Sequence, residues 1–238
     1  MNRLSDPVAR ALIASTSLGL ITVAVRHDRV GVREERLFKL LNGLPDRLYH
    51  PVWLVMQLGT VGAAPVAAGA AWAAGSRPLA GRLLVSGVTA WALSKAFKRV
   101  IRRPRPADLV ADTHVRGGTA SGLGYLSGHA AVAMALGVAA APHLGRQGRR
   151  VILLLVPSVS LARLYVGAHL PLDVIGGAAL GLAVEAATAA AERHLMAVHE
   201  GRGATPWPGR SQSCTPGPAA RRSPRAGQWR RWTPSRRA

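Results

Sequence analysis

The sequence predicts an all-α fold, a polytopic membrane helical bundle with about six transmembrane helices. This prediction rests on apolar runs long enough to cross about 30 Å of hydrocarbon and on the absence of the two-residue alternation typical of strands. The chain also carries 31 Lys and Arg against 11 Asp and Glu, a formal charge of +20. That charge suits nucleic acid or an anionic membrane surface. Because the basic residues crowd between uncharged runs, we expect a membrane and no nucleic-acid partner.

The predicted spans share an apolar composition and lie at about residues 9–25, 51–74, 79–97, 128–144, 151–168 and 172–191. The first is short, and a secretory signal peptide is the alternative because Arg3 and Arg10 precede it. No clear small-residue cleavage site follows it, which favours a retained span. The short connection at residues 145–150 predicts that the helices on either side are antiparallel neighbours.

The spans divide the chain into three parts. Residues 1–50 hold the first span and an amphipathic outer segment, and residues 51–197 form the membrane core. Residues 198–238 form a tail rich in Arg and Pro, which we expect to be disordered on the cytoplasmic side. The tail either adheres to anionic headgroups of the inner leaflet or is a dispensable extension. Its Cys214 is the single cysteine, which excludes an intramolecular disulfide and a cysteine-based metal site.

Basic residues near the span ends predict the orientation. With both termini in the cytoplasm, the inner segments are basic, as the positive-inside rule requires, because they hold the Arg-rich tail together with Arg3, Arg10, Arg77, Arg82, Arg146, Arg149 and Arg150. Two outer segments break the rule. Residues 26–50 mix both signs, and residues 98–126 hold a cationic cluster of Lys98, Arg99, Arg102, Arg103, Arg105 and Arg116. Phosphate binding would explain a cationic segment on that face.

Polar residues gather in three clusters, at residues 98–106, 126–129 and 162–173, which the predicted topology brings to one outer face. Ionisable residues at span ends are functional candidates. Phosphoryl transfer needs fixed positive charge and hydrogen-bond donors around the phosphate oxygens, and Lys98, Arg105 and Arg163 can supply it. A helix beginning at Ser127 and Gly128 would add backbone N–H groups.

Histidine supplies the remaining chemistry. A neutral imidazole can attack phosphorus and form a phosphohistidine, and a second histidine can protonate the leaving alkoxide. Both histidines of the clusters, His129 and His169, lie at predicted span ends.

The three clusters closely resemble the signature of the type 2 phosphatidic acid phosphatase and vanadium haloperoxidase superfamily, over roughly residues 80–191. Lys98 and Arg105-Pro106 match its first motif, and Ser127-Gly128-His129 match its second. The third motif matches at Arg163, His169 and Asp173, with the expected order and spacing.

The resemblance implies a role for each residue. His169 would attack phosphorus, Asp173 would hold its other ring nitrogen, and His129 would protonate the leaving group. The phosphate would be bound by the cationic and helix-start residues, namely Lys98, Arg105, Ser127, Gly128 and Arg163. The family chemistry needs no metal, and we expect no cofactor and no metal site.

The chain departs from the family pattern at two positions. Leu126 stands where the family has Pro, and Ala162 stands where it has Ser. The first loses a rigid entry into the helix, and the second loses a hydroxyl that could support the site.

Several other residues have structural interpretations. His114 is expected to be a solvated loop histidine, and Gly177 with Gly181 is expected to pack helices together. Glu185, inside a span, is expected to pair within the bundle with a partner that the sequence does not identify. Arg102 and Arg103 are either interfacial or contribute positive field to the site.

The favoured function is a membrane phosphatase acting at the outer face on a lipid phosphate monoester or diphosphate, phosphatidic acid-like or polyprenyl-linked. One alternative is a phosphotransferase that uses the same phosphohistidine. The haloperoxidase branch would need vanadate and usually a larger soluble scaffold, and six spans argue against it. The remaining alternative is a catalytically degenerate membrane scaffold or transporter.

Overall fold

The protein is described by a computed structural model that covers residues 6–26, 29–118 and 121–203. Within these ranges the regular elements are all helices, and the one pairing of strand type is an isolated bridge between Pro104 and Leu123. The all-α prediction is therefore confirmed. The predicted disordered tail lies outside the described residues, except that the last helix continues to Gly203.

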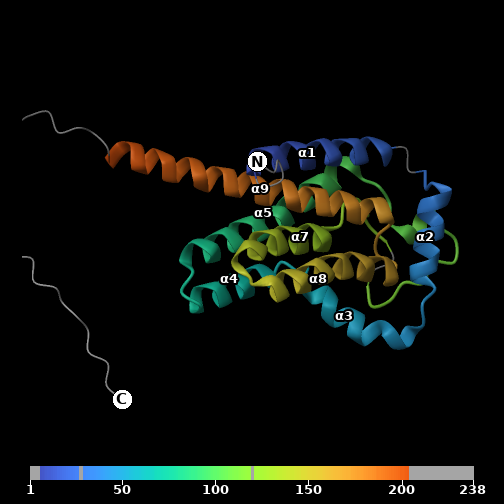
Figure 1. The fold of residues 1–238 in the computed structure, drawn as a ribbon. Coiled ribbons are helices and arrows are strands. Elements are labelled where there is room, and N and C mark those ends of the chain that lie inside the picture. Colours follow the sequence, from blue (N-terminus) through green and yellow to red (C-terminus); the bar gives the residue numbers. More distant parts are fainter. Residues whose placement is uncertain (1–5, 27–28, 119–120, 204–238) are drawn as a thin grey trace, which may run out of the picture.

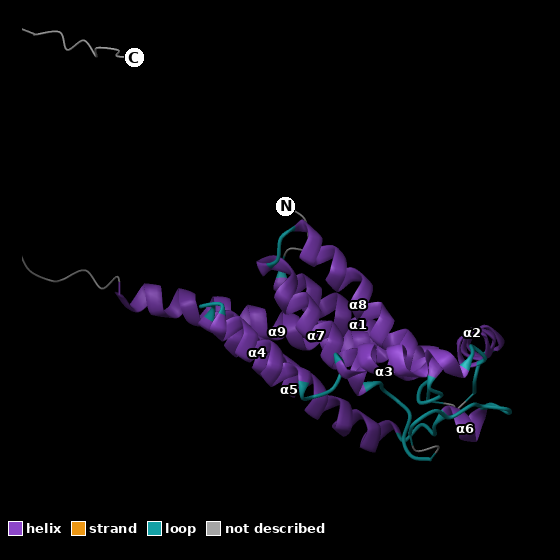
Figure 2. Cartoon of the chain, turned by 90° about the horizontal axis from the view of Figure 1, so that it is seen from below, coloured by secondary structure: helices purple, strands orange, loops and turns teal. Residues whose placement is uncertain are grey.

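The long helices run side by side, and a short helix lies across one end of them (Figure 1). The helices that form the bundle are α1 (Pro7–Ala24), α3 (Tyr49–Gln57), α4 (Ala63–Ala73), α5 (Arg77–Ile101), α7 (Gly128–Ala140), α8 (Arg146–Tyr165) and α9 (Pro171–Gly203). The crossing helix is α2 (Val32–Asn42), and Figure 2 shows it at the same end as the loops and the one-turn helix α6 (Pro106–Leu109).

Two of these helices are long and apolar enough to cross a membrane by themselves, namely α1 and the Pro171–His199 part of α9. The prediction of a continuous span over residues 51–74 is wrong in detail. That segment forms two helices, α3 and α4, separated by turns from Leu58 to Gly62.

The centre of the bundle is α7, which α5 and α9 flank. It is built of Ala, Val, Leu and Gly, and most of its residues are buried. A β-carbon on Gly177 would lie 2.3 Å from the Ser127 carbonyl oxygen, and one on Gly181 would lie 2.1 Å from that of Ala131. The predicted packing role of this glycine pair is thus confirmed. Because α9 touches the backbone of α7, the start of one helix is held beside the start of the other.

A buried ion cluster binds α1 to the bundle away from the α2 end. Glu185 on α9 is fully buried and pairs with Arg82 of α5 and, at 3.4 Å, with Arg10 of α1. Both arginines keep less than a fifth of their side chains exposed. The expected partner of Glu185 is therefore a pair of arginines from two other helices.

The crossing helix α2 is docked rather than freely exposed. Phe38 is fully buried, and Asn42 donates hydrogen bonds to the carbonyl oxygens of His114 and Tyr165 while its side-chain oxygen accepts one from the His114 N–H. Arg116 adds bonds from its guanidinium to Asp46 and to three carbonyl oxygens. These contacts fasten α2 and the following turn to the end of α8.

Candidate active site

The end of the bundle that carries α2 also carries the three predicted polar clusters. The first cluster continues from the end of α5, where Arg102 adopts a left-handed conformation with φ 56° and turns the chain away. The second begins α7, and the third spans the end of α8 and the start of α9. The structure therefore brings together residues that are more than 60 positions apart in the sequence.

His169 lies in the turn between α8 and α9 and is 2% exposed. Its Nδ1 lies 3.8 Å from Oδ2 of Asp173, which is too long for a hydrogen bond but places the carboxylate beside that nitrogen. Catalytic hydrogen bonds are often long before substrate binds and tighten afterwards. Nδ1 is thus the nitrogen that Asp173 can orient, and Nε2 is the one left for attack.

The electrostatic surroundings keep His169 neutral. Burial lowers the pKa of His169 well below its usual 6.5, and the positive charges of Lys98, Arg163 and Arg105 lower it further. A neutral imidazole has a free lone pair and is the nucleophilic form. Because these three cations act on the pKa of the ring, they also lie where they can interact with a phosphate bound at His169.

Asp173 is held by a network that begins on α2. Arg103 donates a hydrogen bond from Nη1 to Oδ1 of Asp173 at 2.8 Å, and the Leu170 N–H donates to Oδ2 at 2.8 Å. On its other side Arg103 pairs with Glu34 at 3.3 Å. Glu34 also accepts a hydrogen bond from the Leu172 N–H at 3.1 Å, so α2 contacts the start of α9 directly.

This network corrects the interpretation of Arg103. The Arg103 side chain is fully buried and forms ion pairs with Glu34 and Asp173, so it is neither interfacial nor available to a phosphate. Its neighbour Arg102 is exposed. Sequence reasoning missed Glu34 altogether. The only signal was a charged residue on the inward face of an amphipathic helix, which does not identify a partner about 70 residues away.

Ser127 acts mainly as the cap of α7. Its Oγ accepts a hydrogen bond from the Ala130 N–H at 3.4 Å, and its own N–H donates to the carbonyl oxygen of Asp173 at 2.9 Å. The backbone N–H of Ser127 is therefore used within the fold. The hydroxyl proton is left as the donor that Ser127 can offer.

Helix packing requires a glycine at position 128, in addition to the phosphate-binding role predicted for Gly128. A β-carbon there would lie 2.8 Å from Oγ of Ser94 on α5. The absence of a side chain thus permits close contact between α5 and α7, whichever group approaches from the other side.

The cations keep donors for a ligand. Lys98 donates to the carbonyl oxygens of Leu123 and Gly124 at 3.1 and 3.2 Å, and an ammonium has a third donor. Nε of Arg163 is buried and has no hydrogen-bond partner within the described ranges, while its Nη1 lies 2.8 Å from the sulfur of Met56. A buried N–H without a partner is costly, and an anion would satisfy it.

Other candidates are excluded from the site. Arg116 belonged to the cationic segment expected to bind phosphate, but its guanidinium is occupied by Asp46 and backbone carbonyl groups. His114 is exposed, as predicted.

His129, by contrast, is half-buried in the first turn of α7, and the backbone at Gly59 packs closely against it.

Comparisons with known proteins identify a family. Residues 79–196 match the family model described as the PAP2 superfamily, a range that runs from α5 into α9 and contains all the predicted site residues. A decaprenylphosphoryl-5-phosphoribose phosphatase from Mycolicibacterium smegmatis is 40% identical over 88 residues, which are 37% of this chain and 46% of that protein. The enzyme of the same name from Mycobacterium tuberculosis is 37% identical over 107 residues, 43% of this chain and 57% of that protein. The matched segment thus spans about half the length of these relatives.

Two solved structures share the fold. LpxE from Aquifex aeolicus superimposes with a TM-score of 0.60 at 20% identity, covering 65% of this chain and 93% of that one. A transmembrane PAP2 type phosphatidylglycerolphosphate phosphatase from Bacillus subtilis superimposes with a TM-score of 0.57 at 22% identity, covering 80% of this chain and 97% of that one.

Proposed function

Since this chain belongs to the PAP2 superfamily, we propose that it is a membrane phosphatase that removes phosphate from a lipid-linked monoester or diphosphate. The observation that carries the proposal is a buried, neutral His169 whose Nδ1 faces Asp173, among the charges of Lys98, Arg105 and Arg163.

The reaction would proceed in two steps. Nε2 of His169 attacks phosphorus, the bond from phosphorus to the ester oxygen breaks, and the electron pair leaves with that oxygen as an alkoxide that His129 protonates. Water then attacks the phosphohistidine, gives its proton to His129 and releases inorganic phosphate together with free His169. Asp173 stabilises the positive imidazole ring while the phosphoryl group is attached.

Membrane placement follows from the same elements. The six predicted spans would correspond to α1, the α3–α4 pair, α5, α7, α8 and α9, with the site at the outer face and both termini in the cytoplasm. The two helices of spanning length support a membrane location, and the basic residues at the proposed inner ends support this orientation.

The substrate proposed first is a polyprenyl-linked phosphate. Two relatives that are 40% and 37% identical over the matched segments are named decaprenylphosphoryl-5-phosphoribose phosphatase. Phosphatidic acid-like lipids are the second group. A phosphotransferase would share the first step and differ only in the acceptor that discharges His169.

The test is phosphate release by purified protein in detergent with EDTA, over a panel of polyprenyl phosphates and glycerophospholipid phosphates. Release should persist in EDTA and disappear in His169→Ala and His129→Ala. The exposed His114→Ala serves as the matched control and should retain wild-type rates. Absence of release from every substrate, with wild type and His169→Ala alike, would favour the degenerate scaffold.

A further inference from the structure

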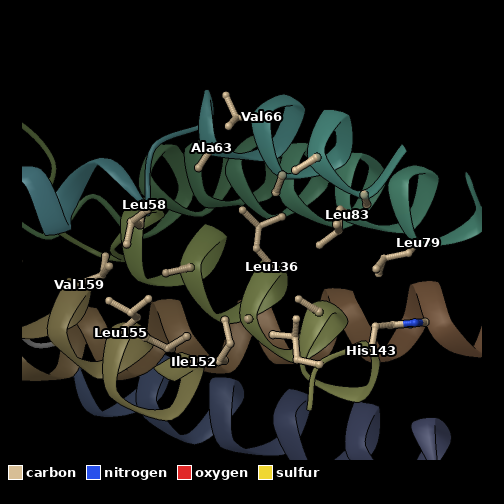
Figure 3. Close-up of a pocket in the computed structure, with 18 of the residues that line it drawn as sticks. Leu58, Ala63, Val66, Leu79, Leu83, Leu136, His143, Ile152, Leu155 and Val159 are labelled. Atoms are coloured by element: carbon tan, nitrogen blue, oxygen red, sulfur yellow. The ribbon is translucent and has the colours of Figure 1, made fainter. Parts of the chain in front are cut away.

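A large apolar groove lies apart from the candidate active site. It has a volume of about 900 Å³ and runs between α4, α5, α7 and α8, with Leu136 and Ile152 among its walls (Figure 3). Among the described residues, none of those assigned to the candidate site lines this groove. The turn at Gly59 separates the two regions, because a β-carbon there would lie 2.6 Å from the His129 carbonyl oxygen. The apolar surface that is connected to the site lies instead on α2.

The crossing helix α2 exposes an apolar stripe. Leu37 is 45% exposed and Leu40 is 70% exposed, and Leu44, just after the helix, is 38% exposed. Leu37 and Leu40 are three residues apart and lie on one side of the helix, which we call the apolar side. The docking residues Phe38 and Asn42 lie on another side. Neighbouring large apolar side chains that are exposed in this way indicate a partner surface.

A third side of α2 is basic. Val32, Arg36 and Lys39 follow one another at helical spacing, and all three are exposed. Arg33 begins the apolar side, where a long arginine side chain can extend its charged end toward lipid headgroups. A helix that carries an apolar side next to a basic side fits the boundary between headgroups and hydrocarbon.

The position of α2 matches that boundary. It crosses the end of the bundle, whereas α1 and α9, the two helices of spanning length, run along the bundle (Figure 1). Residues 25–31 connect it to α1, so α2 begins close to the point where α1 would leave the membrane. The partner that fits is the lipid leaflet at this end, with anionic headgroups beside Arg36 and Lys39 and hydrocarbon beside Leu37 and Leu40.

Glu34 connects this helix to the start of α9. Its side chain is 7% exposed and accepts a hydrogen bond from the Leu172 N–H at 3.1 Å. The first N–H groups of a helix have no partner within that helix, and a carboxylate beside them is stabilising. Glu34 thus caps α9 from a different helix and also pairs with Arg103, which holds Asp173. A shift of α2 would therefore disturb the residues that support Asp173.

We infer that α2 docks on an anionic lipid surface through its apolar and basic sides, and that Glu34 makes turnover at His169 depend on this docking. The inference rests on the proposed phosphatase function and adds a regulator of that site, namely the membrane surface. Lipid contacts on two sides of α2 stabilise the orientation in which Glu34 reaches Leu172 and Arg103.

The first experiment locates α2 relative to the membrane and does not depend on catalysis. Cys214 is the single cysteine, so Cys214→Ser gives a background in which Leu40→Cys or Lys39→Cys carries one spin label. In nanodiscs of phosphatidylcholine and phosphatidylglycerol, oxygen should relax the label at position 40 and a water-soluble nickel chelate the label at position 39. Equal access of the chelate to both positions would overturn the docking. Shielding of position 40 from both reagents would also overturn it, since a second protein would then cover the apolar side.

The second experiment tests the coupling with p-nitrophenyl phosphate, a soluble substrate that the membrane does not deliver. The wild-type kcat should be about fivefold higher in nanodiscs with phosphatidylglycerol than in phosphatidylcholine alone, the lower end of typical couplings between two sites. The readout is kcat, because an anionic surface repels this substrate and alters KM. Leu40→Gln should lose the increase. Val32→Gln is the matched control and should keep it, because Val32 is 64% exposed on the basic side of the same helix.

Glu34→Gln separates the coupling from the docking. The spin label at position 40 should report the same depth in this variant, because both lipid-facing sides of α2 are unchanged. Its kcat should fall and should no longer respond to phosphatidylglycerol, whereas Glu34→Asp, which keeps the charge, should recover part of the response. A full response in Glu34→Gln would contradict the coupling.

The outcomes separate the two proposals. If wild type hydrolyses p-nitrophenyl phosphate in neither lipid, the phosphatase proposal fails while the spin labels still report on docking. If wild type is equally active in both lipids, or Leu40→Gln responds as Val32→Gln does, the coupling is wrong and the phosphatase proposal stands.

Discussion

Arg103 donates a hydrogen bond to Asp173 at 2.8 Å, and both side chains are completely shielded from solvent. This pair connects α2, through Glu34, to the carboxylate that faces His169. The orientation of the candidate nucleophile thus depends on a helix that lies outside the segment matched by the family.

Replacement of Arg103 should therefore damage both stability and activity. Arg103→Met leaves Glu34 and Asp173 as buried carboxylates without a cation, and breaking a buried pair costs about 3–5 kcal/mol. Thermal unfolding in detergent, together with phosphate release, measures the two effects. The exposed Arg99→Met is the control, and equal melting temperatures for the two variants would contradict the proposed role.

His169 should remain neutral at pH values where an exposed histidine becomes charged. Because burial and nearby cations lower the pKa of His169, its ring should not take up a proton as the pH falls through about 6.5. NMR of protein labelled at histidine nitrogen should show a signal that does not change through this pH range and that is absent from His169→Ala. The lowered pKa also affects stability. The protein is most stable at pH values above the pKa that His169 has in the unfolded chain, and this stability is lost as the pH falls toward the lowered pKa of the folded state. A His169 signal that shifts as the pH falls through about 6.5 would refute the assignment.

Loss of Glu185 should loosen α1. Glu185→Ala leaves Arg10 and Arg82 without their shared carboxylate, and we expect a loss of about 3 kcal/mol, the lower end for buried pairs because both arginines keep some exposure. Glu192→Ala is the control, since Glu192 is partly exposed and lies 3.9 Å from Arg82. Chemical unfolding of the two variants measures the difference, and similar stabilities would show that the cluster contributes little.

Gly177→Ala should move α9 away from α7. The added β-carbon would lie 2.3 Å from a backbone oxygen that cannot yield easily, so both melting temperature and phosphate release should fall. Gly69→Ala is the matched control, because nothing lies within 4 Å of its β-carbon and Ala favours a helix interior by about 1 kcal/mol. If Gly177→Ala were as stable as Gly69→Ala, the close contact would not be essential.

The fold class and the location of the site could be predicted because both depend on local signals. Apolar runs identify helices, and the spacing between Arg163, His169 and Asp173 is short enough for one turn and one helix start to determine it. The break between α3 and α4 was missed because the segment is apolar throughout. Gly59 is required there by contact with His129, a residue 70 positions away.

The residues that hold Asp173 in place also could not be predicted, because their partners are distant in the sequence. Arg103 and Glu34 are ordinary charged residues in the sequence, and only the docking of α2 makes them a buried network. Arg116 shows the opposite case, since its charge suggested a ligand but is used by the fold. The sequence reveals where charge is available, whereas tertiary contacts decide which charges remain for a substrate.

The central claim is that His169 carries the phosphoryl group, and rapid acid-free quenching during turnover of a radiolabelled polyprenyl phosphate tests it most directly. Wild type should yield a phosphohistidine that is stable in base and labile in acid, located at residue 169 by peptide mapping, and His169→Ala should yield none. His129→Ala should still retain the label when the leaving group needs no proton, as with p-nitrophenyl phosphate. Steady phosphate release without label on His169, or label on another residue, would contradict the account.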